Sequence, residues 1–344
     1  MASDGLLMAK TYLQRSNSLR EALGIAQVAQ LEPCPLGQGE HNANFTFKHP
    51  ESGEVLVLRI NYASQMNLEH QIEYEASALR VLELSTRTPH LLFVDGSKRI
   101  VDHGVLVMEH RRGSHLDFDR PGDIDEAACI LADIHAVVPD EAPLCPLIDP
   151  EDALCDLCEE NRRMFEAYCA SPLVDVALAR RIEGFFSVAE PLATRMQTPL
   201  GRHVLNTEAV PSHFLIPDDG TPGSMVDWEK PIIGDVARDI AYFTAPTTTI
   251  WDTDFLFDAA GRKAFVERYW RAVDGRFSCS GFDERFDAYL KMNCLRGMTW
   301  SMLAWTEYHD PARPLQNEKT REKLEVYLSE SFIDLLARDI FGIA

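Results

Sequence analysis

The amino-acid sequence predicts an α+β fold in two lobes, a small β-rich lobe followed by a larger, mainly helical lobe. Two patterns carry this prediction. Short apolar runs separated by turn residues fill residues 33–110, whereas apolar residues recur at helical spacing from residue 117 onward. The chain has 344 residues, 46% of them hydrophobic, which suits two packed domains. We place these domains at residues 1–110 and 111–344.

The first domain is expected to combine leading helices with an antiparallel sheet. Apolar residues at helical spacing within residues 1–30 predict one or two helices. Four short apolar or alternating runs predict strands, and a longer run between the second and third predicts a helix over residues 66–84. The predicted strands cover residues 43–48, 54–60, 91–95 and 104–109.

The second domain is expected to be helical apart from one β patch. Residues 122–137 have a helical pattern with acidic residues at the start, where they can cap a helix. The patch at residues 203–228 has two apolar stretches around a turn-rich segment, which is typical of a hairpin. The threonine run at residues 247–249, after Pro246, predicts a loop.

Composition argues against several classes of function. The chain has 33 Lys and Arg against 54 Asp and Glu, a formal charge of −21, so no nucleic-acid partner is expected. No apolar run approaches the ~18 residues of a membrane-spanning helix, and the start of the chain lacks a secretory pattern. Eight sparse cysteines suit free thiols. We therefore expect a cytoplasmic protein without a membrane partner.

The first candidate for chemistry is the glycine-bearing segment at residues 36–44. Gly37 and Gly39 would let backbone amides approach a phosphate, and Asn42 lies in the same segment. A strand rather than a helix is predicted after it, so the segment matches neither the Rossmann nor the Walker pattern. By itself it is better explained as an ordinary hairpin turn.

The second candidate is a cation on a strand, Arg59, followed by a helix that carries Glu75. A basic side chain between buried apolar residues needs a partner, because an unpaired buried charge is costly. A strand cation paired with a helix carboxylate, with its other donors on nucleotide phosphates, is the arrangement of kinases. An edge-strand arginine in water is the alternative.

The third candidate is the β patch, which carries Glu208, His213 and Asp227. Phosphoryl transfer needs one carboxylate for the acceptor hydroxyl and separate oxygen ligands for Mg²⁺, and Glu208 and Asp227 could fill these roles. The kinase pattern His-x-Asp, with Asn five residues later, has a counterpart in Asn206, Glu208 and His213. Either half of the patch alone could also be a solvated hairpin.

Together these segments resemble the aminoglycoside phosphotransferase family, a bilobal branch of the protein-kinase-like fold that includes choline and homoserine kinases. The resemblance covers roughly residues 33–275 and rests on the order of the motifs. Its most specific stretch, residues 225–243, is similar to the family's Asp-Trp-Glu segment and the Gly-Asp-x-x-x-Asp after it. The family's catalytic loop contains His-Gly-Asp, whereas this chain has Asn-Thr-Glu at residues 206–208.

The resemblance implies ATP and Mg²⁺ as cofactors and assigns roles to individual residues. Glu208 would be the base, Asp227 a metal ligand, and His213 the second metal contact, although Mg²⁺ prefers oxygen ligands to imidazole. Asp239 would brace the catalytic loop through backbone hydrogen bonds. The residues implied to bind the nucleotide are Gly37, Gly39, Asn42, Arg59 and Glu75, with Met108, Glu109 and His110 as the hinge at the adenine.

The charge distribution bears on the acceptor. Residues 117–160 contain 14 Asp and Glu and one Arg, a local charge of −13. Such a surface would attract a cationic acceptor, an aminoglycoside or a choline-like amine. A solvated acidic face on an acidic protein is the simpler alternative.

The sequence therefore predicts an ATP- and Mg²⁺-dependent phosphotransferase acting on a hydroxyl of a small molecule that is aminoglycoside-, choline- or homoserine-like. The alternative is a pseudokinase, a nucleotide-binding or structural module without phosphotransfer, because the catalytic loop is atypical. A third hypothesis is transfer of another part of the nucleotide, such as AMP. The identity of the acceptor and the oligomeric state are left open.

Overall fold

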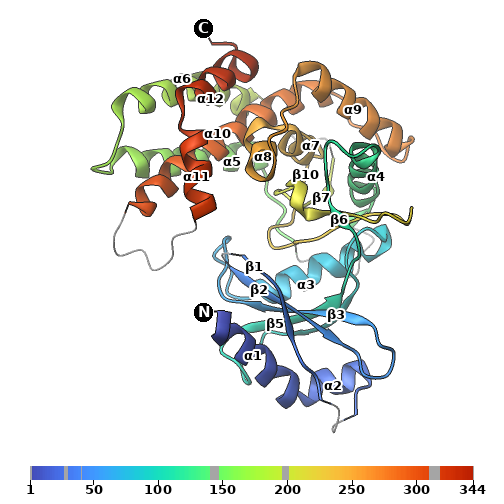
Figure 1. Ribbon diagram of the computed structural model, residues 1–344. Helices are drawn as coiled ribbons and strands as arrows, with labels where there is room; N and C mark the ends of the chain where they lie inside the picture. The colour runs from blue at the N-terminus through green and yellow to red at the C-terminus, as the bar shows by residue number, and fades with distance from the viewer. Residues whose placement is uncertain are drawn as a thin grey trace.

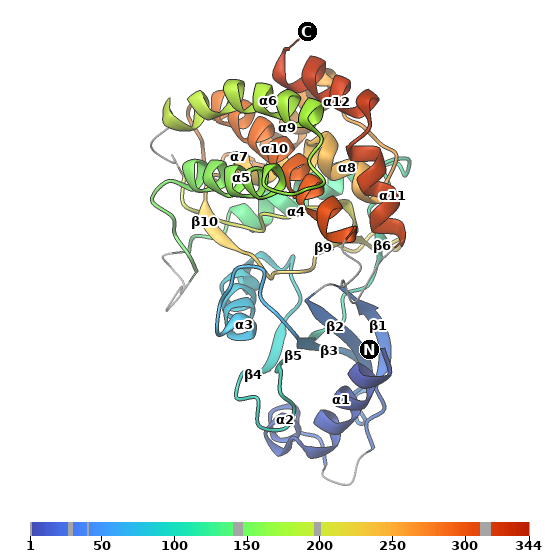
Figure 2. The ribbon, with the colours of Figure 1, turned by 90° about the vertical axis from the view of Figure 1, so that its left-hand side faces the viewer.

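The computed structural model describes residues 2–26, 30–39, 41–139, 147–195, 201–309 and 318–343. It has a small lobe with an antiparallel sheet and a larger helical lobe, which confirms the predicted fold class (Figures 1 and 2). The sheet-bearing lobe contains α1 (Ala2–Arg15), α2 (Asn17–Leu23), β1 (Cys34–Gln38), β2 (Asn42–Lys48), β3 (Val55–Asn61), α3 (Gln71–Leu82), η1 (Glu83–Ser85), β4 (Leu91–Asp95) and β5 (Gly104–Glu109).

The helical lobe also contains the short strands of the predicted β patch. Its first half has β6 (Ser114–His115), α4 (Asp123–His135), α5 (Ala153–Cys169), α6 (Val176–Arg195), β7 (His203–Leu205), η3 (Pro211–His213), β8 (Phe214–Ile216), β9 (Ser224–Met225) and β10 (Ile232–Gly234). Its second half has α7 (Ala237–Thr244), α8 (Pro246–Asp252), α9 (Ala259–Val273), α10 (Phe282–Tyr308), α11 (Glu318–Tyr327), α12 (Glu330–Leu336) and η4 (Ala337–Phe341). None of the helices within the described ranges is long and apolar enough to cross a lipid bilayer.

Most of the predicted strands are found at or within one residue of their predicted bounds. β4 and β5 have the predicted bounds, β2 and β3 lie within one residue of theirs, and the predicted hairpin is present as β8 and β9. The predicted helix over 66–84 is wrong at its start, because α3 begins at Gln71. The Ser64 hydroxyl accepts the backbone N–H groups of Met66 and Leu68 at 3.2 and 2.9 Å, and Asn67 has a φ of 55°. This local turn competes with helix formation.

The predicted loop at residues 247–249 is also wrong, since the threonines lie in α8. Pro246 occupies the first turn of this helix, where a missing N–H breaks no helical hydrogen bond. The threonines are buried, and a Cβ added at Gly297 of α10 would lie 2.6 Å from the Cβ of Thr247. Close packing against α10 therefore overrides the weak helix propensity of threonine.

Both faces of the five-stranded sheet are covered by helices. The strand order is β1-β2-β3-β5-β4. In β3, Leu56, Leu58 and Ile60 share an apolar cluster with α1 and α2, whereas Val57 shares another with α3 (Figure 2). Side chains alternate between the two faces of a strand, so β3 and β5 can be apolar almost throughout. The same alternation turns Arg59 toward α3.

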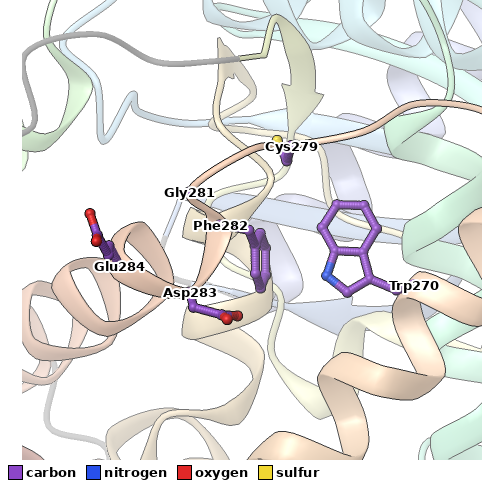
Figure 3. A pocket seen from close by; sticks show the side chains of 6 residues that line it. All are labelled: Trp270, Cys279, Gly281, Phe282, Asp283 and Glu284. Carbon is purple, nitrogen blue, oxygen red and sulfur yellow. The ribbon is translucent and has the colours of Figure 1, made fainter.

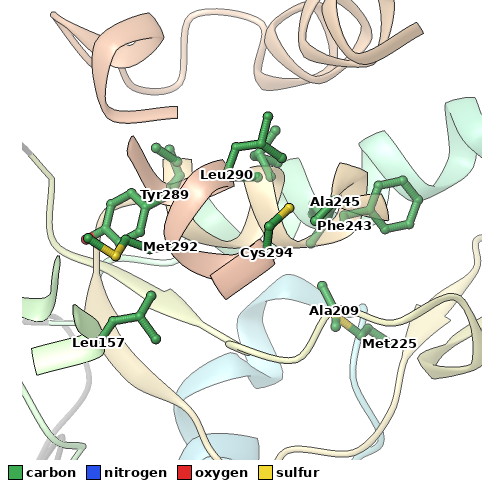
Figure 4. Close-up of a cluster of buried hydrophobic side chains, with 14 of the residues drawn as sticks. Leu157, Ala209, Met225, Phe243, Ala245, Tyr289, Leu290, Met292 and Cys294 are labelled. Carbon is green, nitrogen blue, oxygen red and sulfur yellow. The ribbon is translucent and has the colours of Figure 1, made fainter. Parts of the chain in front are cut away.

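The core of the helical lobe forms around α10. This helix packs against α5, α6, α7 and α8, and Figure 4 shows its residue Met292 near Leu157 of α5 and its residue Cys294 toward Ala245. The same cluster includes Ala209 and Met225, which are fully buried. The two loops that carry Glu208 and Asp227 are thus each anchored in the core within two residues of the carboxylate.

An ion-pair network around Arg87 joins the two lobes. Arg87 precedes β4, and its guanidinium donates to Asp133 and Glu126 of α4, each at 2.7 Å. It also donates to the carbonyl oxygen of Gly223 at 3.0 Å. The Arg87 side chain is nearly buried, whereas both carboxylates are partly exposed. The network therefore holds the segment before β4 against α4 and the loop before β9.

We expect Arg87→Ala to lower the free energy of unfolding by about 2 kcal/mol, because it leaves two partly buried carboxylates without this cation. Chemical denaturation with urea measures the change. Arg268→Ala is the matched control, since Arg268 pairs with Asp125 at the surface and its loss should change stability by less than about 0.5 kcal/mol. Equal effects of the two substitutions would contradict this role for Arg87.

Candidate functional site

Two short loops bring Glu208 and Asp227 to the side of the helical lobe that meets the sheet. The loop with Glu208 follows β7, and the segment with Asp227 lies between β9 and β10. β7 and β10 pair antiparallel, with Leu205 opposite Ile232. Ala209, Met225 and Trp228 are buried beside the two carboxylates. Pairing and burial therefore fix both loops close to where the carboxylates begin.

Asp239 holds the loop of Glu208 by accepting hydrogen bonds from the backbone of that loop, as the resemblance implied. Its carboxylate accepts the backbone N–H groups of Asn206 and Thr207 at 2.7 and 2.9 Å. His135 Nε2 lies 3.4 Å from the same carboxylate, and both side chains are fully buried. Thr207 has a φ of 68°, a conformation that is rare for a β-branched residue and requires support from its surroundings. Asp239 supplies part of that support.

Asn206 joins the two loops directly. Its Nδ2 donates to the carbonyl oxygen of Asp227 at 2.8 Å, and its Oδ1 accepts from the backbone N–H of Glu208 at 3.1 Å. Asp227 also has a positive φ, 66°. Backbone strain of this kind persists where surrounding hydrogen bonds determine the conformation, and it often accompanies functional sites. The side chain of Asn206 therefore sets the relative position of the two carboxylates.

Arg59 makes the ion pair with Glu75 that the sequence predicted, and it also reaches the helical lobe. Its Nη1 lies 2.6 Å from Glu75 Oε1 and 3.0 Å from Asp227 Oδ1. Its Nε donates to Asn44 at 2.9 Å. Burial raises the pKa of Asp227, but Arg59 and His213 outweigh burial and hold it below its usual value. Asp227 is therefore ionised at neutral pH.

Helix α3 positions the segment after Asp227. Gln71 Nε2 donates to the carbonyl oxygen of Glu229 at 2.7 Å, and Tyr74 donates to that of Pro231 at 2.5 Å. Glu75 lies one turn further along the helix. The helix that holds the partner of Arg59 thus also holds the backbone around Glu229.

Glu229 is a further carboxylate of this cluster that was not assigned a role from the sequence. Its Oε1 lies 3.9 Å from Arg59 Nη1 and accepts a hydrogen bond from Asn42 Nδ2. Burial and the neighbouring Asp227 raise the pKa of Glu229 to about 8. The side chain of Asn42, predicted to bind nucleotide, thus contacts Glu229 and also accepts from Asn61 at 2.9 Å.

His213 lies beside Asp227, with Nε2 3.6 Å from Asp227 Oδ2. Its Nδ1 is buried and has no hydrogen-bond partner among the described residues. No group of three or more metal-binding side chains occurs in the part of the chain that the structure describes. Mg²⁺ at kinase sites is held by one or two carboxylates together with nucleotide phosphates and water. Asp227 fits that requirement, whereas the imidazole of His213 does not.

Glu208 is held by two cations from distant parts of the chain. Lys230 Nζ and Arg296 Nη2 both donate to Glu208 Oε1, at 3.1 and 3.0 Å. Burial disfavours the ionised carboxyl, but the two cations outweigh it and lower the pKa of Glu208 to about 2. Oε2 makes no hydrogen bond to any described residue. One oxygen of the carboxylate is therefore fixed, and the other can accept a proton.

The glycine segment leaves space above the β1–β2 turn. A Cβ added at Gly37 would meet no atom within 4 Å, and one added at Gly39 would lie 3.9 Å from the carbonyl oxygen of Asn42. Glu40, between them and Asn42, lies outside the described residues. No hydrogen bond or ion pair joins either glycine to Asp227 within the described ranges, so their assignment to phosphate stays a prediction.

The predicted hinge residues differ in how their backbones are used. Met108 lies within the sheet, opposite Val57 and Leu91, and its side chain is buried. The N–H of Glu109 donates to the carbonyl oxygen of His90 at 2.9 Å. His110 follows the strand, and its backbone groups make no hydrogen bond to the residues that the structure describes. Of the three, His110 has both backbone groups available.

Four residues of the site were not predicted from the sequence: Asn44, Glu229, Lys230 and Arg296. Glu229 and Lys230 directly follow the Asp-Trp pair, so their position was a usable signal. Asn44 is opposite Arg59 in the β2–β3 register. Arg296 is far along the chain on α10, and no local pattern distinguishes it from the other arginines there.

A shallow hollow elsewhere in the helical lobe shares no residue with this cluster. It lies between the end of α9 and the start of α10 and is lined by Trp270, Cys279, Gly281, Phe282, Asp283 and Glu284 (Figure 3). Its lining has two carboxylates and no cation. We therefore centre the candidate site on Asp227.

We expect Asp239→Asn to lower the free energy of unfolding by roughly 2 kcal/mol, because the new amide N–H₂ would face a backbone N–H that now has an acceptor. Urea denaturation measures this. Asp258→Asn is the control, since Asp258 caps α9 at the surface and asparagine caps helices equally well. Unchanged stability in Asp239→Asn would show that the loop of Glu208 does not depend on this carboxylate.

We also expect Glu229 to make stability depend on pH. Between its ordinary pKa of 4.5 and its raised value of about 8, the folded chain holds a proton that the unfolded chain has released. The free energy of unfolding therefore falls as pH rises through this range. Without ligands, Glu229→Gln should remove this fall. The free energy of unfolding of the variant, relative to that of the native chain, should therefore increase by more than about 1 kcal/mol by pH 8.

Thermal and urea unfolding from about pH 5 to 8 test this difference. Glu51→Gln is the control, because Glu51 is exposed and should leave the pH dependence unchanged. Parallel curves for the native chain and Glu229→Gln would contradict the raised pKa.

The sequence was also compared with those of known proteins. A sequence model of the phosphotransferase enzyme family matches residues 32–281, which is more than half of the chain. No curated protein matches this chain.

Solved structures of small-molecule kinases share the fold. A choline kinase from Cryptosporidium parvum has a TM-score of 0.62 at 14% identity, covering 98% of this chain and 97% of that one. An ethanolamine kinase from Plasmodium vivax has 0.59 at 14%, covering 90% and 85%. A spectinomycin phosphotransferase, solved with ADP and spectinomycin, has 0.59 at 13%, covering 88% and 89%.

These identities establish only the shared fold, whereas the family match confirms the predicted family and enzyme class. The chain, which shares its fold with solved small-molecule kinases, therefore belongs to the phosphotransferase enzyme family.

Proposed function

We propose that this protein transfers the γ-phosphoryl group of Mg²⁺-bound ATP to a hydroxyl group of a small molecule. One observation carries the proposal: Asp227 contacts Arg59 of the sheet-bearing lobe and is joined through Asn206 to the loop of Glu208. Groups suited to the nucleotide and to the acceptor therefore converge on one carboxylate. The nucleotide complexes among structures of similar fold support the use of a nucleotide.

Each residue of the cluster has a role in this proposal. Arg59 would bind the nucleotide phosphates while Glu75 holds its position. Gly37 and Gly39 would lie over the phosphates, and the backbone of His110, with Met108 and Glu109 before it, would meet adenine. Asp227 would hold Mg²⁺, which would neutralise charge on the transferred phosphoryl group. His213 would position Asp227 rather than bind the metal itself.

Glu208 would orient the acceptor and take its proton. The acceptor oxygen forms a bond to the γ-phosphorus while the bond from that phosphorus to the bridging oxygen breaks, and ADP leaves with the bonding electrons. The hydroxyl proton passes to Glu208 Oε2. With a pKa of about 2, this carboxylate is a weak base, which suits late proton transfer in a reaction that depends mainly on positioning and charge.

The enzymes of similar fold indicate only the general chemical class of the acceptor. Choline, ethanolamine and spectinomycin, named for the enzymes of similar fold, are small molecules with hydroxyl groups. A homoserine-like acceptor belongs to the same class. The seven cysteines within the described ranges are free thiols, which supports a cytoplasmic location, where ATP is abundant.

A pseudokinase is the second candidate, and a specific observation favours it. Both cations on Glu208 stabilise its ionised form and oppose protonation. Glu208 also departs from the aspartate of the family pattern by one methylene, and a misplacement of about 1 Å can reduce a rate about a hundredfold. In this case the cluster would bind nucleotide without transferring phosphate.

We expect Asp227→Ala to weaken Mg²⁺-dependent ATP binding at least about a hundredfold, because it removes the carboxylate proposed to hold the metal. Isothermal titration calorimetry with and without Mg²⁺ measures this. Asp254→Ala, at an exposed position outside the cluster, should bind ATP normally. Equal affinity of the native chain and Asp227→Ala for Mg²⁺-ATP would overturn the site assignment.

Glu208→Gln separates the two candidates. It should retain Mg²⁺-ATP binding but lower turnover about a hundredfold or more, because the amide cannot take the hydroxyl proton. Release of ADP and the mass of the product measure turnover. ATP binding without any phosphorylated product, in the native chain as in the variant, would favour the pseudokinase.

A further inference from the structure

The carboxylate of Glu208 is the end of a chain of ion pairs that begins on α5. Arg296 of α10 lies in the middle of this chain: its Nε donates to Glu160 of α5 at 3.3 Å, and its Nη2 donates to Glu208 Oε1 at 3.0 Å. The Arg296 side chain is only 13% exposed. Two carboxylates hold two different nitrogens of a planar group, so the guanidinium has a fixed orientation. One oxygen of Glu208 is therefore positioned by two helices that pack against each other in the core.

Lys230 holds the same oxygen of Glu208. Its Nζ donates to Oε1 at 3.1 Å, and its side chain is 15% exposed. The backbone of Lys230 is also tied to the loop of Glu208, because Thr207 Oγ1 donates to the carbonyl oxygen of Lys230 at 2.8 Å. Both cations thus bind Oε1, while the side chain of Glu208 remains 25% exposed and can present Oε2 to an acceptor.

The backbone of Glu208 has little freedom to compensate for a side chain of another length. Its N–H donates to Asn206 Oδ1 at 3.1 Å, and its carbonyl oxygen accepts from the N–H of Val210 at 2.7 Å. The next residue, Ala209, is fully buried. The start of the side chain is therefore fixed as firmly as the oxygen at its end.

An aspartate on this backbone could not make the same contacts. It lacks one methylene, and a carbon–carbon bond of about 1.5 Å draws the carboxylate back by roughly 1 Å. Distances of 3.0 and 3.1 Å to the two cations would then exceed the range of a hydrogen bond. Lys230 could follow by changing rotamer, whereas Arg296 is also held by Glu160. The contact with Arg296 therefore requires the length of glutamate.

We propose that Arg296 is a positioning residue for phosphoryl transfer, which with Lys230 holds Glu208 Oε1 so that Oε2 faces the acceptor hydroxyl, and that it makes glutamate the required residue at position 208. The inference rests on the proposed phosphotransferase function. Arg296 acts through Glu208 and touches neither acceptor nor nucleotide in this role. Misplacing a reacting group by about 1 Å can reduce a rate about a hundredfold. Restoring the aspartate of the family pattern should therefore slow the reaction, whereas repair of a damaged site would speed it up.

The first test measures ADP release from Mg²⁺-ATP by the full chain, with water as the acceptor and again with choline, ethanolamine or spectinomycin added. Glu208→Asp and Arg296→Gln should each lower kcat at least about tenfold and leave the KM for ATP unchanged. Arg296→Lys should restore part of kcat, because it keeps the charge but not the planar geometry. Arg268→Gln is the control, since Arg268 pairs with Asp125 at the surface, and should change neither constant.

The second test does not depend on turnover. Without ligands, Glu208→Asp should lower Tm by at least about 2 °C, because two nearly buried cations lose an acceptor. Adding Arg296→Gln to this variant should lower Tm by less than Arg296→Gln does alone, since the contact is already lost. Glu32→Asp is the matched control: Glu32 also pairs with a lysine, Lys10, but both side chains are exposed, and its Tm should change by less than about 1 °C.

Three results would overturn the proposal: faster ADP release by Glu208→Asp than by the native chain, equal kcat in Arg296→Gln and the native chain, or equal Tm in Glu208→Asp and the native chain. Should Arg296→Gln not fold, Glu208→Asp and Arg296→Lys carry the test, because each keeps a charge at its position. Failure of the proposed function appears separately, as no ADP release by the native chain with any acceptor. The role of Arg296 in transfer then falls with it, and a lowered Tm in Glu208→Asp would still support the requirement for glutamate.

Discussion

The buried guanidinium of Arg59 is the constraint on which the arrangement of the two lobes depends. Only 4% of the residue is exposed, and a charge removed from water to this extent needs carboxylates in contact with it. The carboxylates come from α3 and from the segment after β9, and they are Glu75, Asp227 and, more distantly, Glu229. One side chain of the sheet therefore fixes a helix on its face and a loop of the other lobe.

The same cluster has more negative than positive charge without ligands. Three carboxylates surround one guanidinium, and burial together with the neighbouring Asp227 raises the pKa of Glu229. A divalent cation at Asp227 would reverse this imbalance, so the cluster suits a metal that arrives with the nucleotide. Around Glu208 the charges balance, because Lys230 and Arg296 are paired with Glu208 and Glu160. The site thus has one part deficient in positive charge and one part in which cations and carboxylates are matched.

Local patterns in the sequence predicted four of the five strands of the sheet, because strands depend on periodicity, whereas the Arg59–Glu75 pair was predicted from the kinase arrangement of a strand cation and a helix carboxylate. Alternation in β3 places Arg59 on the face of Val57, and helical spacing places Glu75 on the face of Ile72 and Leu79. Contacts set by tertiary packing could not be predicted in this way. Arg296 meets Glu208 only because α10 crosses the lobe, and α8 is helical only because its threonines pack against Gly297.

Three of the departures from the family's catalytic pattern are connected to one another in space. Asn206 bridges the backbones of Asp227 and Glu208, His213 lies beside the Asp227 carboxylate, and Glu208 extends to Lys230 and Arg296. A side chain one methylene longer than aspartate reaches two cations with one oxygen and keeps the other free. Each of these three side chains has at least one specific partner, although His213 Nδ1 is buried without a hydrogen-bond partner among the described residues. The altered loop is therefore better described as a rebuilt set of contacts than as a damaged one.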